Sequence, residues 1–589
     1  MKLLPGVILV ALALSGTTVA ATRVNSAGSK YFDEADRALR DGQTADSNAS
    51  VEKGWAAVLA AGPIAPGFLE GVDDASRIFS ALGLGLRAEG VYSQAETLTA
   101  DPEQKLLWLR LQYMHADYFI RHSEYVKAES TLRSSFSAEN RTAQKSSLYV
   151  AFLQSLAFVR EQQGDLDGAE AFYRMTMGYP PPDLPDVVGQ HLFFGKQPLP
   201  FIGEPRLSMA AFYANHGRTK EAEALYLEQL AQPSLNSEER LGILQQLTGF
   251  LSAHVSKTEA LAVQEQIVEF RKTQPLTTPA LRDLLANERY QLANLEVDVG
   301  RANDAKALLE SDLRQAELQH GKTSPEYTEA LNYLFENRTY ARDYDSAEKW
   351  AREEVERAEA LGASESIGLA SALFHLADVR GAQGHIKESE ALGKRGIEVN
   401  RADFPEPLST RRFADAEALV RAGKPGEAVR IAREISEGAA RRDSRADQFG
   451  FHHLAQLMVI DDKSGAAQVA SIALSVAERG ALPQDLTLAR DLTDWANFYR
   501  GALGEPDRAR DLLTRAQTIV RACCETTSPM MEPVLQERAW LAGATDGQAA
   551  SIPYLEQLRD LRASIYGVHS RQVEQTTHDL AAAKAKAGQ

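Results

Sequence analysis

The residues that could do chemistry in this sequence are twelve histidines, two cysteines and many carboxylates. His452 and His453 are adjacent, so on a helix their rings would point about 100° apart and could not share a metal ion well. No His-x-x-x-His or His-Glu-x-x-His spacing occurs, and neither does a Gly-x-Ser-x-Gly elbow or a Walker loop. Metal-assisted hydrolysis, nucleophilic catalysis and nucleotide binding therefore lack their usual residues. The sequence predicts no enzyme activity, no metal site and no cofactor.

The two cysteines, Cys523 and Cys524, are adjacent. Neighbours in sequence rarely form an unstrained disulfide, because the usual Cα separation exceeds what adjacent residues offer. The fold must therefore rest on packing. In an oxidising compartment the pair could be reactive, or one cysteine could be packed and the other incidental. Both interpretations stay open, as does the redox state.

Charge and composition exclude some partners. The chain has 589 residues, 44% of them hydrophobic and 25% charged, and a formal net charge of −17. A nucleic-acid binder needs a basic face to neutralise phosphates, and no such face is visible. Many carboxylates stand four residues from Arg or Lys, as Glu348 does from Arg352, which is typical of a solvated helix face. The length predicts several domains or a repeat array.

The N-terminus has the features of an export signal. Lys2 supplies the positive charge, Leu3 to Leu14 form the apolar run, and small residues near Ala20 and Ala21 suit cleavage. We expect residues 1–21 to be a signal peptide and the mature chain to be periplasmic or secreted. The alternative is a retained single anchor. No later stretch of about 20 apolar residues occurs, so no membrane span is expected in the mature chain.

The elements that must position any site are helices arranged in repeats. In the first clear unit, Phe79, Leu82 and Leu86 mark one helix face, Gly90 is expected to end the helix, and Ala95 is expected on its partner. A small residue recurs in the second helix of each unit, with most spacings between 38 and 45 residues. These anchors are Ala95, Ala128, Ala169, Ala222, Ala260, Ala305, Ala347, Ser389, Ala428, Ala467, Ala509 and Ala550.

One segment interrupts this regularity. Residues 178–205 hold seven of the 23 prolines, and proline cannot continue a helix. The segment is either a functional loop or an insertion that covers a groove or a weak junction. The predicted organisation is a signal peptide (1–21), capping helices (29–75), repeats (76–177), the Pro-rich loop (178–205) and further repeats (206–589).

The repeat unit resembles the tetratricopeptide repeat (TPR), in the longer form found in kinesin light chains. The resemblance is carried by Leu82-Gly83, Tyr92 and Ala95, and by the stretches 320–325, 331–334 and 344–350. Arg342 departs from it by replacing the turn glycine, and Gly393 and Gly396 fall inside a helix. The resemblance implies an all-α fold, a right-handed α-α superhelix of about 10–12 helix hairpins.

The resemblance also implies which residues face the concave groove. In this repeat class the second, fifth and ninth positions of each first helix point inward, and amide and aromatic side chains there suit a bound peptide. These predicted groove residues are Asn287, Tyr290, Asn294, Asn332, Glu336, Tyr340, Phe374 and Asp378, followed by Phe413 and Glu417. The interleaved acids argue against capture of an acidic C-terminal tail.

The sequence therefore predicts an exported scaffold that binds a protein or peptide partner, with no nucleic acid. Two alternatives stay open. One is a regulatory or accessory subunit of a partner enzyme such as a caspase-like peptidase, since arrays resembling this one are often found with such partners. The other is a factor for assembly or transport at the cell envelope. The partner, the pathway and the oligomeric state are not encoded in any motif.

Overall fold

The computed structural model describes residues 26–40, 43–135, 148–177, 204–274, 278–361, 366–403, 408–421, 423–438, 444–479, 481–482, 485–523 and 528–587. Within these residues the secondary structure is helical and contains no strand, as the repeat pattern predicts. The predicted signal peptide (1–21) and Cys524 lie outside the described residues. The predicted loop at 178–205 also lies outside them, except for its last two residues. No described helix is both long and apolar enough to cross a membrane.

The described residues form 27 α-helices, and within each unit most helices pack against the next one in the chain. The N-terminal helices are α1 (Ser29–Arg40), α2 (Thr44–Ala61), α3 (Phe68–Ala81), α4 (Gly85–Leu98), α5 (Lys105–Arg121), α6 (Tyr125–Ser134), α8 (Leu148–Gln162) and α9 (Leu166–Thr176). The middle helices are α11 (Pro205–Asn215), α12 (Thr219–Leu230), α13 (Ser237–His254), α14 (Lys257–Lys272), α15 (Pro279–Asp298), α16 (Ala302–His320), α17 (Pro325–Tyr340), α18 (Tyr344–Leu361), α19 (Ser366–Ala382) and α20 (Ile386–Asp403).

The C-terminal helices continue the series. They are α21 (Leu408–Arg421), α22 (Pro425–Gly438), α23 (Ser444–Met458), α24 (Lys463–Arg479), α25 (Leu486–Phe498), α26 (Pro506–Cys523), α27 (Met531–Thr545), α28 (Gln548–Tyr566) and α29 (Arg571–Ala587). A short 3-10 helix (Pro102–Gln104) precedes α5, and a π-helical turn (Tyr499–Leu503) follows α25.

Nine of the described hairpins turn at a residue with positive φ, and in each of these a small residue follows five positions later in the second helix. Glycine tolerates positive φ because it has no Cβ, so it dominates at this position. The pairs are Gly83 and Ala88, Ser123 and Ala128, Gly164 and Ala169, Gly217 and Ala222, Gly300 and Ala305, Arg342 and Ala347, Gly384 and Ser389, Gly423 and Ala428, and Gly504 and Ala509. Arg342, which replaces the turn glycine, has φ 57°.

This spacing corrects the first predicted unit. Gly90 does not end a helix but lies inside α4, and the turn is at Gly83, with φ 76°. The anchor is Ala88, which is fully buried and stands 40 residues before Ala128, rather than Ala95. Two further anchors were also misplaced by one residue, because Ala466 and Ser551 are buried whereas Ala467 and Ala550 are not.

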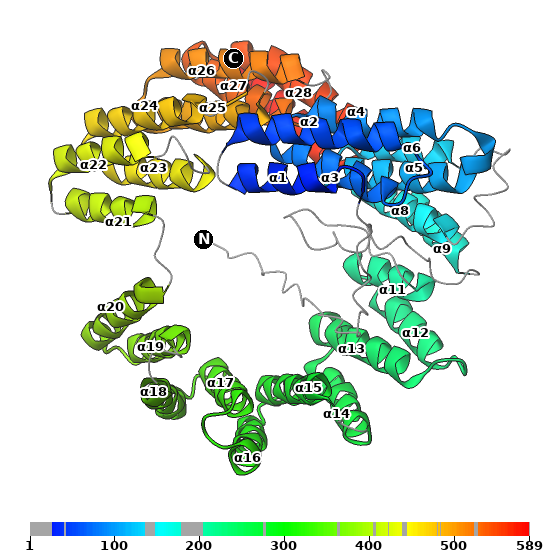
Figure 1. Cartoon of the computed structure of the whole chain (residues 1–589), viewed down its shortest axis with the longest axis vertical. Helices are drawn as coiled ribbons and strands as arrows, with labels where there is room; N and C mark the ends of the chain where they lie inside the picture. The colour runs from blue at the N-terminus through cyan, green and yellow to red at the C-terminus, as the bar shows by residue number, and fades with distance from the viewer. Residues whose placement is uncertain are drawn as a thin grey trace. The chain divides into compact units, whose positions relative to one another are not determined.

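The helices form two compact units (Figure 1). Unit 1 contains Met209–Glu406, and its core joins buried residues of α15 to α19, such as Ala305, Leu331 and Ala347. Unit 2 contains Ala20–Ser208 together with Pro407–Gln589, so segments from both ends of the chain fold as one body. Unit 2 has one core cluster in its N-terminal segment and another in its C-terminal segment.

Candidate binding surface

The predicted groove residues of unit 1 lie on α15, α17 and α19, the first helices of three successive hairpins. In Figure 1, α13, α15 and α17 form one layer of this unit, and α14, α16 and α18 form the other. Local caps fix where these helices begin. Thr278 Oγ1 accepts a hydrogen bond from the Leu281 amide (3.3 Å), and Ser324 Oγ accepts one from the Tyr327 amide (3.1 Å). Each cap precedes a proline at the first helical position, where no amide donor is needed.

Side chains of α15 and α17 pair across the gap between the two helices. The rings of Tyr290 and Tyr333 stack with centroids 4.6 Å apart and planes 14° apart. Asn337 Nδ2 donates to Asn294 Oδ1 (2.7 Å). Tyr340 donates its hydroxyl proton to Asp298, the last residue of α15.

Tyr290, Asn294 and Tyr340 were predicted from the sequence, whereas Tyr333 and Asn337 were not. Each missed residue comes one position after a predicted one, Asn332 or Glu336. A signal for them existed, because Tyr290-x-x-x-Asn294 recurs 43 residues later as Tyr333-x-x-x-Asn337. Equivalent positions of neighbouring first helices face each other, so a repeated residue pair predicts a contact.

Two phenylalanines in the predicted set serve packing. The Phe374 ring lies so close to Gly396 of α20 that a Cβ there would come within 2.9 Å of Cε1. Phe413, which is buried in unit 2, lies in the same way against Gly450 of α23 (2.5 Å). In both cases a glycine inside the neighbouring helix leaves room for the phenylalanine ring. This explains why a glycine occurs at position 396 within α20.

His375, which the sequence argument did not single out, joins α19 to its neighbours. Its ring stacks on Phe335 of α17 with centroids 4.4 Å apart, and its Nδ1 lies 2.9 Å from a Glu354 carboxylate oxygen. Burial opposes the charged ring, but the hydrogen bond and charge of Glu354, with smaller contributions from Glu336 and Asp378, leave the pKa of His375 raised.

The phenols and carboxylates of this surface influence one another. Burial, followed by a hydrogen bond with Glu336, raises the pKa of Tyr290 to about 12, while Asn294 opposes the shift. The hydrogen bond to Asp298 raises the pKa of Tyr340 to about 12. Tyr333 donates to Glu329 (2.9 Å), and burial, opposed by that bond, raises the pKa of Glu329. The tyrosines therefore remain hydrogen-bond donors at neutral pH.

We call this surface the first-helix face. It comprises Tyr290, Asn294, Glu329, Tyr333, Glu336, Tyr340 and Asp378. Asn287 lies beside it, exposed on α15, and its Oδ1 accepts from Gln291 (3.2 Å). Asn332 Nδ2 donates to Glu336 (3.4 Å), while its buried Oδ1 has no hydrogen-bond partner. An exposed amide such as that of Asn287 can pair with the backbone of an extended segment.

Unit 2 has a different surface where its N-terminal and C-terminal segments meet, which we call the seam. Two backbones approach directly there, since the Leu486 amide lies 3.4 Å from the Gly83 carbonyl oxygen. A Cβ on Gly164 would lie 2.6 Å from the His569 carbonyl oxygen. Tyr125 and Tyr566 pack across the seam with ring centroids 6.1 Å apart.

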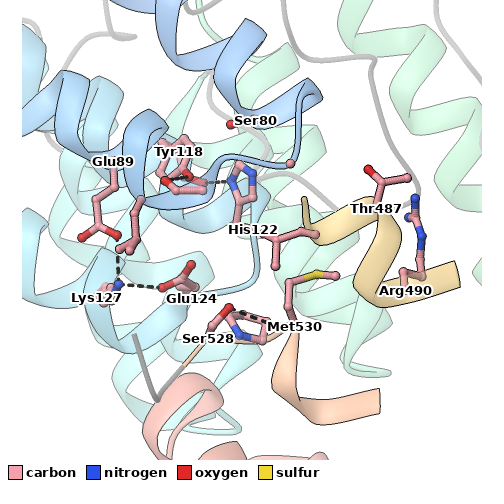
Figure 2. A pocket seen from close by; sticks show the side chains of 15 residues that line it. Ser80, Glu89, Tyr118, His122, Glu124, Lys127, Thr487, Arg490, Ser528 and Met530 are labelled. Carbon is pink, nitrogen blue, oxygen red and sulfur yellow. Dashed lines mark hydrogen bonds and ion pairs between the residues drawn. The ribbon is translucent and has the colours of Figure 1, made fainter. Parts of the chain in front are cut away.

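A pocket of about 190 Å³ opens beside Gly83 at the seam (Figure 2). Lys127 forms ion pairs with Glu124 (3.0 Å) and Glu89 (3.1 Å) on one wall, and Thr487 and Arg490 lie on the opposite side. Burial opposes the charge on Lys127, but the two carboxylates leave its pKa raised. The sequence argument gave no sign of this pocket, because its walls come from opposite ends of the chain.

His122 also lines the pocket, and its Nδ1 lies 2.7 Å from the Tyr118 carbonyl oxygen. Its pKa is lowered, first because the surrounding protein disfavours the charged ring and then because Arg121 is close. Among the described residues, no group of three or more His, Cys, Asp or Glu side chains is arranged to hold a metal ion.

Comparison with known proteins gives likenesses of fold only. No protein-family model matches the sequence, and no curated protein matches it either. BtubC from P. vanneervenii is 17% identical, with 42% of this chain and 94% of that chain covered and a TM-score of 0.27. Naa15/Naa10 bound to HypK-THB is 12% identical (95% and 97% covered, TM-score 0.30), and yeast Tom70 is 12% identical (95% and 96%, 0.25). Because these TM-scores are low, we assign the fold from the helix hairpins that the structure shows and not from these likenesses.

Proposed function

Because the chain is an all-α, tetratricopeptide-like helical solenoid, we propose that it is a scaffold that binds an extended protein segment on the first-helix face of unit 1. Folds of this kind commonly mediate protein–protein interactions. One observation carries the proposal. The first-helix face aligns aromatic rings and amides on consecutive helices, where Tyr290 stacks on Tyr333 and Asn337 bonds to Asn294.

The chemistry of this face suits recognition of a backbone and its side chains. Tyrosine rings offer large contact area at a low cost in side-chain entropy, and aromatic residues are enriched at binding hot spots. Tyr340 is 53% exposed although its hydroxyl is held by Asp298, so its ring is oriented and accessible. A surface that is ordered before binding loses less entropy when a partner arrives.

Site-specific photo-crosslinking tests this assignment. A benzophenone amino acid in place of Tyr340 should give one discrete covalent adduct in the native host, whereas the same group in place of Leu318 should not. Leu318 is a matched control because it is 86% exposed and lies near the end of α16, a second helix. The adduct at position 340 should disappear when Tyr290 and Tyr333 are both changed to alanine. Equal adducts at both positions, or one that survives the double change, would reject the first-helix face.

We also propose that the scaffold acts outside the cytoplasm. The support is the sequence of the first residues, with Lys2 followed by the apolar run from Leu3 to Leu14. Cell fractionation followed by intact-mass measurement should find a chain that begins at Ala21 or Thr22. A full-length chain in the cytoplasmic fraction would contradict export without affecting the binding proposal.

A further inference from the structure

Several carboxylates of the first-helix face have no lysine or arginine partner. In the part of the chain that the structure describes, no Lys or Arg nitrogen lies within 4.0 Å of Glu329, Glu336 or Asp378. Glu329 instead has two further carboxylates, Asp283 and Glu326, as its charged neighbours. The hydrogen bonds that Glu329 and Glu336 accept come from neutral groups, namely the Tyr333 and Tyr290 hydroxyls and the Asn332 amide.

Two carboxylates on the second helices of the same hairpins do have cationic partners, one of which, Arg380, lies on α19. Glu348 of α18 pairs with Arg352 (2.7 Å), as the i,i+4 spacing predicts, and also with Arg380 (3.1 Å). Glu388 of α20 pairs with Arg380 (2.6 Å) and Arg352 (3.3 Å). This network neutralises two carboxylates with two guanidinium groups. Glu329, Glu336 and Asp378 have no such guanidinium partner among the described residues.

The composition of unit 1 agrees with this contrast. Residues 209–406 contain 33 Asp and Glu but only 22 Lys and Arg, so most of the net charge of the chain lies in this stretch. The uncompensated carboxylates also lie among tyrosine rings. Tyr333, which stacks on Tyr290, lies near both Glu329 and Glu336, and the face of a tyrosine ring attracts ammonium and guanidinium groups.

We propose that the first-helix face selects a cationic partner, an extended protein segment rich in lysine or arginine, and this inference rests on the scaffold function proposed above. Such side chains would pair with Glu329, Glu336 and Asp378 and lie against the tyrosine rings, while Asn287 and Asn294 contact the segment's backbone. Complementary charge across an interface fixes register and rejects partners of the wrong sign. An acidic segment would meet like charge along the whole face.

Three fluorescein-labelled peptides of twelve residues test the charge class. They share an alternation of tyrosine or leucine with a second residue, which is lysine in the first peptide, glutamine in the second and glutamate in the third. Fluorescence anisotropy with the full chain should show the lysine peptide binding ~5-fold more tightly than the glutamine peptide, since two ion pairs worth about 0.5 kcal/mol each give that ratio. The glutamate peptide should not bind.

Charge-matched variants separate this face from the net charge of the chain. Glu329→Gln with Glu336→Gln should weaken the lysine peptide ~5-fold and leave the glutamine peptide unchanged, because the amide still accepts the Tyr333 and Asn332 hydrogen bonds. Glu356→Gln with Glu390→Gln changes the net charge equally on α18 and α20, where both carboxylates are exposed, and should leave both affinities unchanged.

The possible outcomes distinguish the two proposals. If the glutamine peptide binds as tightly as the lysine peptide, or if both variant pairs weaken binding equally, the cationic assignment is wrong while the scaffold function stands. If the lysine peptide does not bind although crosslinking at position 340 persists, the cationic assignment again fails alone. Loss of both the binding and the crosslink removes the scaffold function together with the inference.

Discussion

The first-helix face of unit 1 and the seam of unit 2 are built from the same hairpin but use it differently. At the first-helix face, side chains of neighbouring helices pair and leave carboxylates uncompensated. At the seam, glycine turns bring backbones together, and the nearby Lys127 is fully paired. A few side chains on each hairpin determine the chemistry of its surface. The space around its turn determines whether a distant hairpin can pack against it.

The largest expected effect breaks the seam. Gly83→Ala and Gly164→Ala both add a Cβ at positive φ and drive it into backbone, at 2.9 Å from the Leu486 amide and 2.6 Å from the His569 carbonyl oxygen. We expect each change to cost about 1–2 kcal/mol for the backbone conformation and a further 1–3 kcal/mol for the collision. Thermal unfolding and hydrogen exchange should show this loss in peptides of unit 2 that cover the seam.

Gly217→Ala and Gly300→Ala are the matched controls. Both glycines hold the same turn position with φ 73° and 84°, and a Cβ there would meet nothing within 4 Å. They should show only the backbone cost, confined to unit 1. If all four variants lose the same stability, close packing at the seam adds nothing to the stability of unit 2. The proposed difference between the two regions would then be wrong.

A second prediction sharpens the packing behind the first-helix face. Gly396→Ala would place its Cβ 2.9 Å from the Phe374 ring, whereas Gly393→Ala in the same helix meets nothing within 4 Å. Alanine in a helix interior is favoured over glycine by about 0.5–1 kcal/mol, so Gly393→Ala should raise the stability of unit 1 by that amount. Gly396→Ala should lower it by about 1–3 kcal/mol because the ring must move.

Chemical denaturation of the two variants, followed by hydrogen exchange of α19 and α20, measures the expected gain of stability for Gly393→Ala and the expected loss for Gly396→Ala. An increase in stability for Gly396→Ala as well would mean that Phe374 is free to leave the hairpin. The ring would then be available to a partner, as the sequence pattern predicts for this position.

Much of the fold could be predicted from the sequence because it is local and repeated. A buried small residue five positions after a turn residue is set by one hairpin, and its recurrence is visible without any long-range contact. The error at Gly90 and Ala95 arose because Gly83 and Gly90 are both plausible turns, and only the backbone conformation distinguishes them.

The seam could not be predicted in the same way. Gly83 and Gly217 look alike in sequence and have almost the same φ, yet only Gly83 touches a distant segment. The first-helix face lies between these cases. The repeated Tyr-x-x-x-Asn pattern can be recognised in the sequence. The contacts of Phe374 with Gly396 and of His375 with Glu354 cannot, because they depend on how the helices pack against one another.

A smaller effect is expected at Arg342, where the turn lacks its glycine. A non-glycine residue at φ 57° is strained, and the Arg342 side chain is exposed. Arg342→Gly should therefore raise the stability of unit 1 by about 0.5–1 kcal/mol, since relief of the strain exceeds the entropy that glycine loses. Ala341→Gly, one position earlier at φ −72°, should lower it by about 0.5–1 kcal/mol. Thermal unfolding of both variants decides whether solvent-facing turns follow backbone conformation alone.

The smallest expected effect is a pH dependence of opposite sign in the two regions. The pKa of His375 is raised by the Glu354 carboxylate, so its contribution to stability is full below the unfolded pKa and is lost as the pH rises through the folded value. The pKa of His122 is lowered by its surroundings, so its contribution is present above the unfolded pKa and is lost as the pH falls through the folded value.

His375→Gln should therefore destabilise unit 1 most near pH 5.5 and progressively less toward pH 8. His122→Gln should make unit 2 relatively more stable than the wild type as the pH falls, because the variant has no ring to protonate. Hydrogen exchange of each unit across this pH range measures both differences within one molecule. If stability changes with pH in the same way in both units, general titration of carboxylates sets the pH response rather than these two rings. The electrostatic contrast between the first-helix face and the seam would then have no support.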